Sequence, residues 1–217
     1  MIIMGVSGFL FDLDGVLIDS MSYHADSFIS AFSEYGIDVD EKTIYDLEGK
    51  EDRYIIRDLL EEKGLLEEFN IEEITGRRRK IFNEIENTKA FDGMRDLLLD
   101  LGERYRLALV SGSNRENMED FVDKFFPGVF DCLTSGDDAA RQKPHADPYL
   151  TCLDKLNLDR EEAIVVENAP LGVESAIRAG IKCLAVATYV DKKDLAAADE
   201  VFSDHMELKK YIKEKFL

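Results

Sequence analysis

Two aspartates, Asp12 and Asp14, stand where an apolar segment gives way to a turn, in Gly8-Phe9-Leu10-Phe11-Asp12-Leu13-Asp14-Gly15. Residues i and i+2 of a strand point to the same side, so both carboxylates can serve one site. Two acids at the end of a buried strand are costly to desolvate unless a cation or a phosphoryl group interacts with them. The pair taken alone also fits an ordinary turn, because Asp and Gly are common turn residues. The choice between these interpretations depends on the rest of the chain.

Three later segments also place a polar side chain at the end of an apolar run or just before a helix. Ser111 follows Leu107-Ala108-Leu109-Val110, Lys143 precedes a helix that Asp147 can cap, and Glu167-Asn168 follows Ile164-Val165-Val166. In an open parallel sheet these points collect at one edge, outside the carboxyl ends of the strands. The order Asp-x-Asp, Ser, Lys, Glu-Asn resembles the haloacid dehalogenase superfamily of phosphohydrolases and phosphomutases. The resemblance covers nearly the whole chain.

The resemblance assigns catalytic roles to the two aspartates. It implies that Asp12 is the nucleophile that forms an aspartyl-phosphate. Asp14 would protonate the leaving group and then deprotonate the attacking water, a role that we expect to need a pKa above that of a free aspartate. Acids around a phosphate also need a cation, and Mg²⁺ prefers oxygen ligands. Family members bind it through the nucleophile and the backbone carbonyl of the second aspartate, which here are Asp12 and Asp14.

The fourth motif departs from the family pattern, because Glu167-Asn168 stands where Glu-Asp is usual. We expect Asn168 to face the metal, although Glu167 stays open as the direct ligand. For phosphate binding, the resemblance implies the hydroxyl of Ser111, the backbone N–H groups of Gly112 and Ser113, and the charge of Lys143. The segment Ser113-Asn114-Arg115-Glu116 also fits a capping box, so a helix N-terminus is expected to point at the same anion.

Other candidate residues lie in the segment expected to form a cap. His24 follows the first junction, where the subfamily resembling β-phosphoglucomutase and phosphoglycolate phosphatase often has a histidine; it is either a partner of Asp14 or structural. Glu48-Gly49 stands where the mutases carry Lys-Gly, and Arg53 lies close to the place of their substrate-binding arginine. The Glu-Gly pair together with Glu-Asn-Ala-Pro-Leu-Gly resembles the inorganic-pyrophosphatase-like branch. We expect Glu48 to reach the metal when the cap closes.

The run Arg77-Arg78-Arg79-Lys80 also falls in this cap segment. Such runs usually form a solvated helix face. The alternative is that one arginine faces the cleft and holds an anion of the substrate.

The pattern of apolar runs predicts an α/β fold with a doubly wound parallel sheet and an inserted helical cap. Strands are expected at 6–12, 105–111, 129–134, 163–167 and 182–187, with helices in their connections. Helices are expected from Asp19-Ser20 to Gly36, over 53–63 and 71–86, and from Met206 to the C-terminus. The simplest division is a core of residues 1–16 and 89–217 with a cap at 17–88.

The amino-acid composition restricts the classes of molecule that the protein is expected to bind. The 217 residues carry a net charge of −19, which argues against nucleic acid and anionic membranes, because both need a basic surface. Cys132, Cys152 and Cys183 are widely spaced, which predicts buried thiols in a reducing cytoplasm rather than a zinc site or disulfides. The first eleven residues lack a basic segment and predict a strand rather than a signal peptide. We expect a cytoplasmic monomer whose partner is a small phosphorylated substrate or pyrophosphate.

Together these observations predict a Mg²⁺-dependent phosphohydrolase acting on a small phosphorylated metabolite or on inorganic pyrophosphate. The alternative enzyme is a β-phosphoglucomutase, against which Glu48 counts. A signalling receiver would lack the helical insert. A catalytically inactive phosphate-binding protein is a further alternative, because Asn168 removes a charged ligand from the expected metal site.

Overall fold

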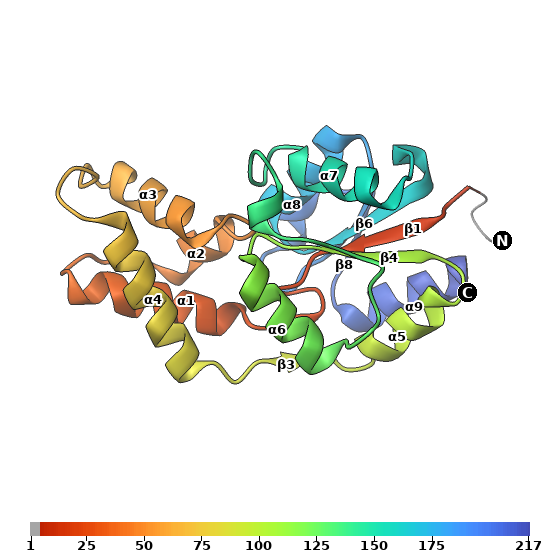
Figure 1. Cartoon of the computed structure of the whole chain (residues 1–217), viewed down its shortest axis with the longest axis horizontal. Coiled ribbons are helices and arrows are strands. Elements are labelled where there is room, and N and C mark those ends of the chain that lie inside the picture. Colours follow the sequence, from red (N-terminus) through yellow and green to blue (C-terminus); the bar gives the residue numbers. More distant parts are fainter. Residues whose placement is uncertain (1–4) are drawn as a thin grey trace.

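The computed structural model describes residues 5–217, and its centre is a six-stranded sheet in which every strand pair is parallel. The strand order is β5-β4-β1-β6-β7-β8, so β1 lies in the middle (Figure 1). The strands are β1 (Gly8–Phe11), β4 (Arg106–Val110), β5 (Cys132–Thr134), β6 (Ala163–Glu167), β7 (Lys182–Val186) and β8 (Glu200–Phe202). The predicted parallel α/β fold is therefore confirmed.

Two strand predictions need correction. β1 ends at Phe11, because the backbone N–H of Asp12 makes a last bond to Val166 and the chain then turns back, with the N–H of Leu17 bonded to Leu13. Asp12 and Asp14 therefore lie just beyond the strand. The edge strand β8 was not predicted, because it has only three residues and only one of them is buried.

Helices cover both faces of the sheet. Phe9 and Phe11 of β1 face α5 (Met94–Gly102), α6 (Arg115–Phe125) and α9 (His205–Phe216), whereas Leu10 faces α7 (Asp147–Leu156) and α8 (Pro170–Ala179). A strand buried on both faces needs apolar residues at every position, which explains the continuous apolar runs of the sequence. Asp147 does not cap α7 as predicted: the cap position is Ala146, and the Asp147 carboxylate instead pairs with Arg141.

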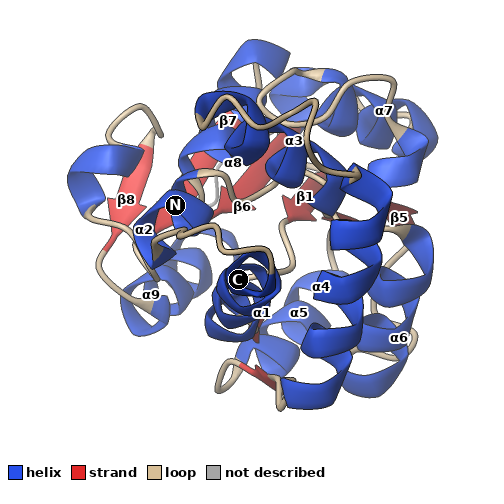
Figure 2. Cartoon of the chain, turned by 90° about the vertical axis from the view of Figure 1, so that its left-hand side faces the viewer, coloured by secondary structure: helices blue, strands red, loops and turns tan. Residues whose placement is uncertain are grey.

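The cap consists of four helices with a core of their own. They are α1 (Met21–Glu34), α2 (Glu41–Asp46), α3 (Asp52–Glu62) and α4 (Ile71–Ile85), packed around side chains that include Phe28, Phe32, Leu59 and Ile74. The chain enters through β2 (Ile18–Asp19) and leaves through β3 (Lys89–Ala90), which pair antiparallel. Seen from the cap side, these helices stand in front of the central sheet (Figure 2).

The remaining elements are short 3₁₀ helices: η1 (Gly136–Asp138), η2 (Arg160–Glu162) and η3 (Lys192–Leu195). All three cysteines are free, and Cys152 and Cys183 are buried as expected, whereas Cys132 is only half-buried. In the described residues 5–217, no helix is long and apolar enough to cross a membrane.

Candidate active site

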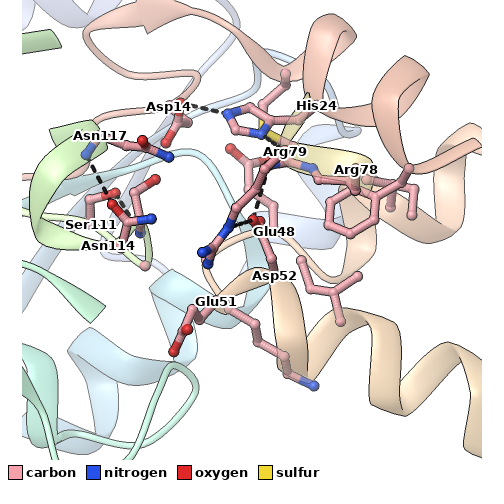
Figure 3. Close-up of a pocket in the computed structure, with 18 of the residues that line it drawn as sticks. Asp14, His24, Glu48, Glu51, Asp52, Arg78, Arg79, Ser111, Asn114 and Asn117 are labelled. Atoms are coloured by element: carbon pink, nitrogen blue, oxygen red, sulfur yellow. Dashed lines mark hydrogen bonds and ion pairs between the residues drawn. The ribbon is translucent and has the colours of Figure 1, made fainter. Parts of the chain in front are cut away.

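A cavity of about 50 Å³ lies between the core and the cap, beyond the carboxyl ends of β1 and β4. The core side is formed by Asp12, Asp14 and the segment from Ser111 to Asn114, and the cap side by residues of α1, α3, α4 and the loop around Glu48 (Figure 3). Glu48 of the cap is buried against Asn168 of the core, so the structure describes cap and core in contact.

Lys143 connects the first and fourth motifs. Its Nζ lies 2.6 Å from Asp12 Oδ1, 2.6 Å from Glu167 Oε1 and 3.3 Å from the carbonyl oxygen of Val110. An ammonium group has three protons, so these three acceptors use all of them. Burial alone would lower the pKa of Lys143, but the carboxylates of Asp12 and Glu167 raise it above its usual value, so the side chain is charged.

Both carboxylate oxygens of Glu167 accept hydrogen bonds from other groups of the protein. Its Oε1 accepts from Lys143 and from the hydroxyl of Tyr149 at 2.8 Å, and its Oε2 accepts from the backbone N–H groups of Asn168 and Ala169. Between the two candidates of the fourth motif, the geometry therefore favours Asn168 as the side chain facing a ligand.

Asn168 and Glu48 meet across the boundary between core and cap. Asn168 Nδ2 donates to Glu48 Oε1 at 2.9 Å, and both side chains are buried. Asn168 Oδ1 and Glu48 Oε2 have no hydrogen-bond partner in the described part of the chain. The approach depends on Gly15, because a Cβ atom there would lie 2.1 Å from Asn168 Nδ2. Two buried oxygens without partners in the described residues, one from the core and one from the cap, thus belong to side chains that contact each other.

The acids of this region lack sufficient compensating charge. Burial raises the pKa of Asp12 well above its usual value despite Lys143, and burial together with Asp12 and Glu167 does the same for Glu48. Residues 5–217 hold no group of three or more His, Cys, Asp or Glu that could bind a metal by itself. A mixed set of carboxylate, amide and backbone oxygens nevertheless fits a hard divalent cation, which would pair the two orphan oxygens and relieve the repulsion.

Asp14 is held by the first turn of the cap. Its Oδ1 accepts a hydrogen bond from Ser20 Oγ and lies 3.3 Å from His24 Nε2, and His24 stacks on Phe82. Burial acts to raise the pKa of Asp14, but His24 and Ser20, with the charge of Arg78, leave it below its usual value. The predicted raised pKa is therefore wrong for this arrangement, because the cap surrounds Asp14 with donors.

The arginines of the cap are arranged differently from the prediction. Arg53 is half-exposed, pairs with Glu51 and does not line the cavity. Its neighbour Asp52 does, because successive residues of a helix face different directions. Arg78 and Arg79 both line the cavity, and Arg78 is only 1% exposed. The expected solvated face is wrong for Arg78, and the alternative that an arginine of this run faces the cleft agrees with the position of Arg79, which is partly exposed at the cavity.

The segment after β4 offers fewer backbone donors than predicted. Ser111 is buried, and its Oγ accepts from the N–H of Ser113 at 3.1 Å, so the hydroxyl proton of Ser111 and the N–H of Gly112 are left for an anion. The capping box at Ser113 is wrong: Asn114 caps α6, and its Oδ1 accepts from Asn117 N. Asn117 and Asp52 line the cavity although no motif of the sequence marked them, and Asn114, which fell in the predicted capping box, lines it as well.

We compared the sequence with known protein families. Residues 9–186 match the haloacid dehalogenase-like hydrolases. The chain belongs to this family. It is therefore a hydrolase, and the predicted superfamily is confirmed.

Individual relatives narrow the subfamily. The chain is 32% identical to the phosphoglycolate phosphatase of Aquifex aeolicus, over 83% of this chain and 85% of the relative. Its fold matches a putative β-phosphoglucomutase of Bacteroides vulgatus with a TM-score of 0.88 and 30% identity, covering 97% of this chain and 88% of that one. A putative pyrophosphatase of Caldanaerobacter subterraneus is 27% identical over 84% of this chain and 82% of its own length. These similarities place the hydrolase near both phosphatases and mutases.

Proposed function

We propose that this hydrolase is a Mg²⁺-dependent phosphohydrolase that acts on a small phosphorylated substrate, with pyrophosphate as a candidate, through an aspartyl-phosphate intermediate. The observation that carries the proposal is Asp12, a buried carboxylate whose Oδ1 is fixed by Lys143 at 2.6 Å and which borders the cavity beside Ser111. A carboxylate fixed at one oxygen can attack phosphorus with the other.

The reaction has two steps, and each residue has a role in one or both of them. Asp12 attacks phosphorus while the bond to the leaving oxygen breaks, and Ser111 donates a hydrogen bond to a phosphoryl oxygen. The carboxyl group of Asp14, which lies 3.3 Å from His24 Nε2, carries the proton that passes to the leaving oxygen. In the second step water attacks the aspartyl-phosphate, Asp14 takes the proton of that water, and phosphate leaves.

We assign the Mg²⁺ ligands to Asp12, the backbone carbonyl of Asp14, Asn168 Oδ1 and Glu48 Oε2. The orphan state of the last two oxygens supports this set. When bound, Mg²⁺ would neutralise charge on the transferred phosphoryl group. Glu48 would then tie metal binding to cap closure, because it is the only one of the four that comes from the cap.

A β-phosphoglucomutase is the second candidate, favoured by the similarity to the Bacteroides vulgatus structure. Glu48 counts against a mutase, because it places a carboxylate where the mutases carry a lysine. An inactive phosphate-binding protein is disfavoured by the two orphan oxygens, which supply ligands that replace the usual aspartate.

The test is a screen of phosphorylated metabolites with and without Mg²⁺, including pyrophosphate and β-glucose 1-phosphate. We expect phosphate release that requires Mg²⁺, and acid-quenched enzyme that carries phosphate on the peptide containing Asp12. Conversion of glucose 1-phosphate to glucose 6-phosphate would support the mutase instead. Phosphate release without any phosphorylated Asp12 would contradict the mechanism.

A further inference from the structure

Asp52 orients two neighbouring arginines of α4 in different ways. Its Oδ2 accepts from Arg78 Nη1 and from Arg79 Nε, both at 3.1 Å. Arg78 is almost fully buried and its guanidinium lies over the rings of Phe28 and Phe82, at 4.5 and 4.9 Å from their centroids. The side chain of Arg79 is 38% exposed. One carboxylate thus holds one arginine inside the cap and the other at the cavity.

Arg79 keeps a free binding edge. Only its Nε is bonded to Asp52, and its two terminal nitrogens have no hydrogen bond within residues 5–217. Figure 3 shows its guanidinium projecting from the cap toward the core segment that contains Ser111 and Asn114. Asn114 and Asn117 line the cavity on that opposite side. A ligand group placed between them would meet N–H donors of Arg79 on one side and amide groups on the other.

The surroundings make such a cation necessary for an anionic ligand. The chain carries a net charge of −19, and Glu48, Glu51 and Asp52 all border this cavity. Lys143 is used by Asp12 and Glu167. Arg78 contacts Asp52 and His24 through its two terminal nitrogens, and only its buried Nε has no partner in the described part of the chain, so neither cation offers a pair of free N–H groups to the substrate's leaving side. The planar fork of a guanidinium binds a phosphate or carboxylate through two parallel hydrogen bonds.

We infer that Arg79 determines specificity by binding a negatively charged group on the leaving side of the substrate. This inference rests on the proposed phosphohydrolase function and names its substrate class. The preferred substrates are small compounds in which a second phosphoryl group or a carboxylate lies next to the transferred phosphoryl group. Phosphate esters of neutral alcohols leave the Arg79 edge without a partner. Asp52 acts as the positioning residue that fixes this edge.

The test compares substrates matched in size. Wild type and Arg79→Gln are assayed for kcat/KM with pyrophosphate, 2-phosphoglycolate and 2-hydroxyethyl phosphate, of which only the last has a neutral leaving group. We expect Arg79→Gln to lower kcat/KM about 10- to 100-fold for the two charged-leaving-group substrates, the range for loss of a charge-assisted hydrogen bond, and less than about 3-fold for the neutral one. The ratio of pyrophosphate to 2-phosphoglycolate distinguishes a phosphoryl from a carboxylate partner.

The same basic run supplies a matched control. Arg77 pairs with Glu34 on the cap surface and does not line the cavity, so Arg77→Gln should leave all three values unchanged. An equal loss on all three substrates in Arg79→Gln would overturn the inference and indicate a structural role. Arg79→Lys should recover part of the preference, because it restores the charge without the fork.

A binding measurement separates this inference from the proposed function. Calorimetry with pyrophosphate and Mg²⁺ on Asp12→Asn protein, with and without Arg79→Gln, does not depend on turnover. We expect about 10-fold weaker binding in the double variant. Equal binding with and without Arg79→Gln would overturn the inference, even if the wild-type enzyme hydrolyses phosphate esters. If the double variant binds more weakly but the wild-type enzyme hydrolyses none of the three substrates, Arg79 is an anion site and the proposed function is refuted.

Discussion

In the core, the functional side chains directly follow strand ends, whereas in the cap they project from helix faces and a loop. Asp12 and Asn168 come one residue after β1 and β6, so their positions are set by the register of the sheet. His24 and Arg79 come from α1 and α4 and are placed by the packing between these helices and by ion pairs such as that with Asp52. In the proposed mechanism the core therefore fixes the reacting groups, and the cap can change its contacts to the substrate without disturbing them.

The largest effect is expected for a substitution in the core. Asp12→Asn removes the proposed nucleophile and metal ligand, so turnover should fall by on the order of 10⁴-fold or more while the fold is kept. Steady-state kinetics with Mg²⁺ and circular dichroism check both parts. Asp123→Asn, on the exposed side of α6, is the control. Near-full Mg²⁺-dependent activity in Asp12→Asn would refute the aspartyl-phosphate mechanism.

Asp14→Asn should have a smaller effect, because it removes proton transfer and leaves the nucleophile. We expect a loss of roughly 10²–10⁴-fold in kcat. Burst kinetics can show whether phosphorylated Asp12 accumulates, as it should if Asp14 activates the second-step water. Loss of both the burst and turnover would place its main contribution in the first step.

The next comparison sets a core lysine against a cap lysine. Lys143→Met leaves Glu167 buried without its charge partner, which should cost about 3–5 kcal/mol of unfolding free energy. Lys50→Met removes a partly exposed pair with Asp58 and should cost about 0–1 kcal/mol. Urea denaturation measures both. Similar costs for the two variants would mean that the core pair does not behave as a buried charge pair.

A double-mutant cycle tests whether core and cap share the metal. Glu48→Ala should raise the Mg²⁺ concentration needed for activity, and adding Asn168→Asp should restore part of the affinity, because the new carboxylate replaces the lost charge. The coupling free energy should lie between about 0.5 and 3 kcal/mol. Strictly additive effects on the apparent Mg²⁺ affinity would show that the two residues do not bind one ion.

The smallest effect is expected at the hinge, where the two regions join. His205 stacks on Phe91 and its Nε2 contacts the carbonyl of Val16, and burial lowers its pKa below 6.5. The unfolded chain then binds the proton more readily, so stability should decrease as the pH falls through 6.5 and level off below the folded-state pKa. His205→Gln should remove this step in thermal unfolding, and His145→Gln should retain it.

Sequence reasoning identified the core groups because strand ends converge for a topological reason. Asp12 and Ser111 line the cavity, and Lys143 and Asn168 are buried next to it, in contact with Asp12 and Glu48. Sequence reasoning did not predict the hydrogen-bond or ion-pair partner of each of these side chains. Lys143, for example, donates all three of its protons to protein acceptors. This depends on distances that only the folded structure sets.

Sequence reasoning was weaker in the cap, where helix rotation decides which residue enters the cavity. Arg53 was chosen by its place in the chain, but the neighbouring residue faces the cavity. One signal was available for the basic run. Ile74, Arg78 and Ile81 recur at helical spacing, so Arg78 had to lie on the apolar face of α4. No comparable pattern marks Asp52, whose role depends on contact between α3 and α4.

The pairing of β2 with β3 has a consequence for how this enzyme can be rebuilt. Ile18 lies opposite Ala90 and Asp19 opposite Lys89, so the two ends of the inserted helices are neighbours. A segment whose ends are adjacent can be exchanged without moving the chain on either side. The helices between Asp19 and Lys89 therefore form a cassette. A chimera that carries the corresponding segment of a relative would keep the chemistry of its own sheet and acquire a different choice of leaving group.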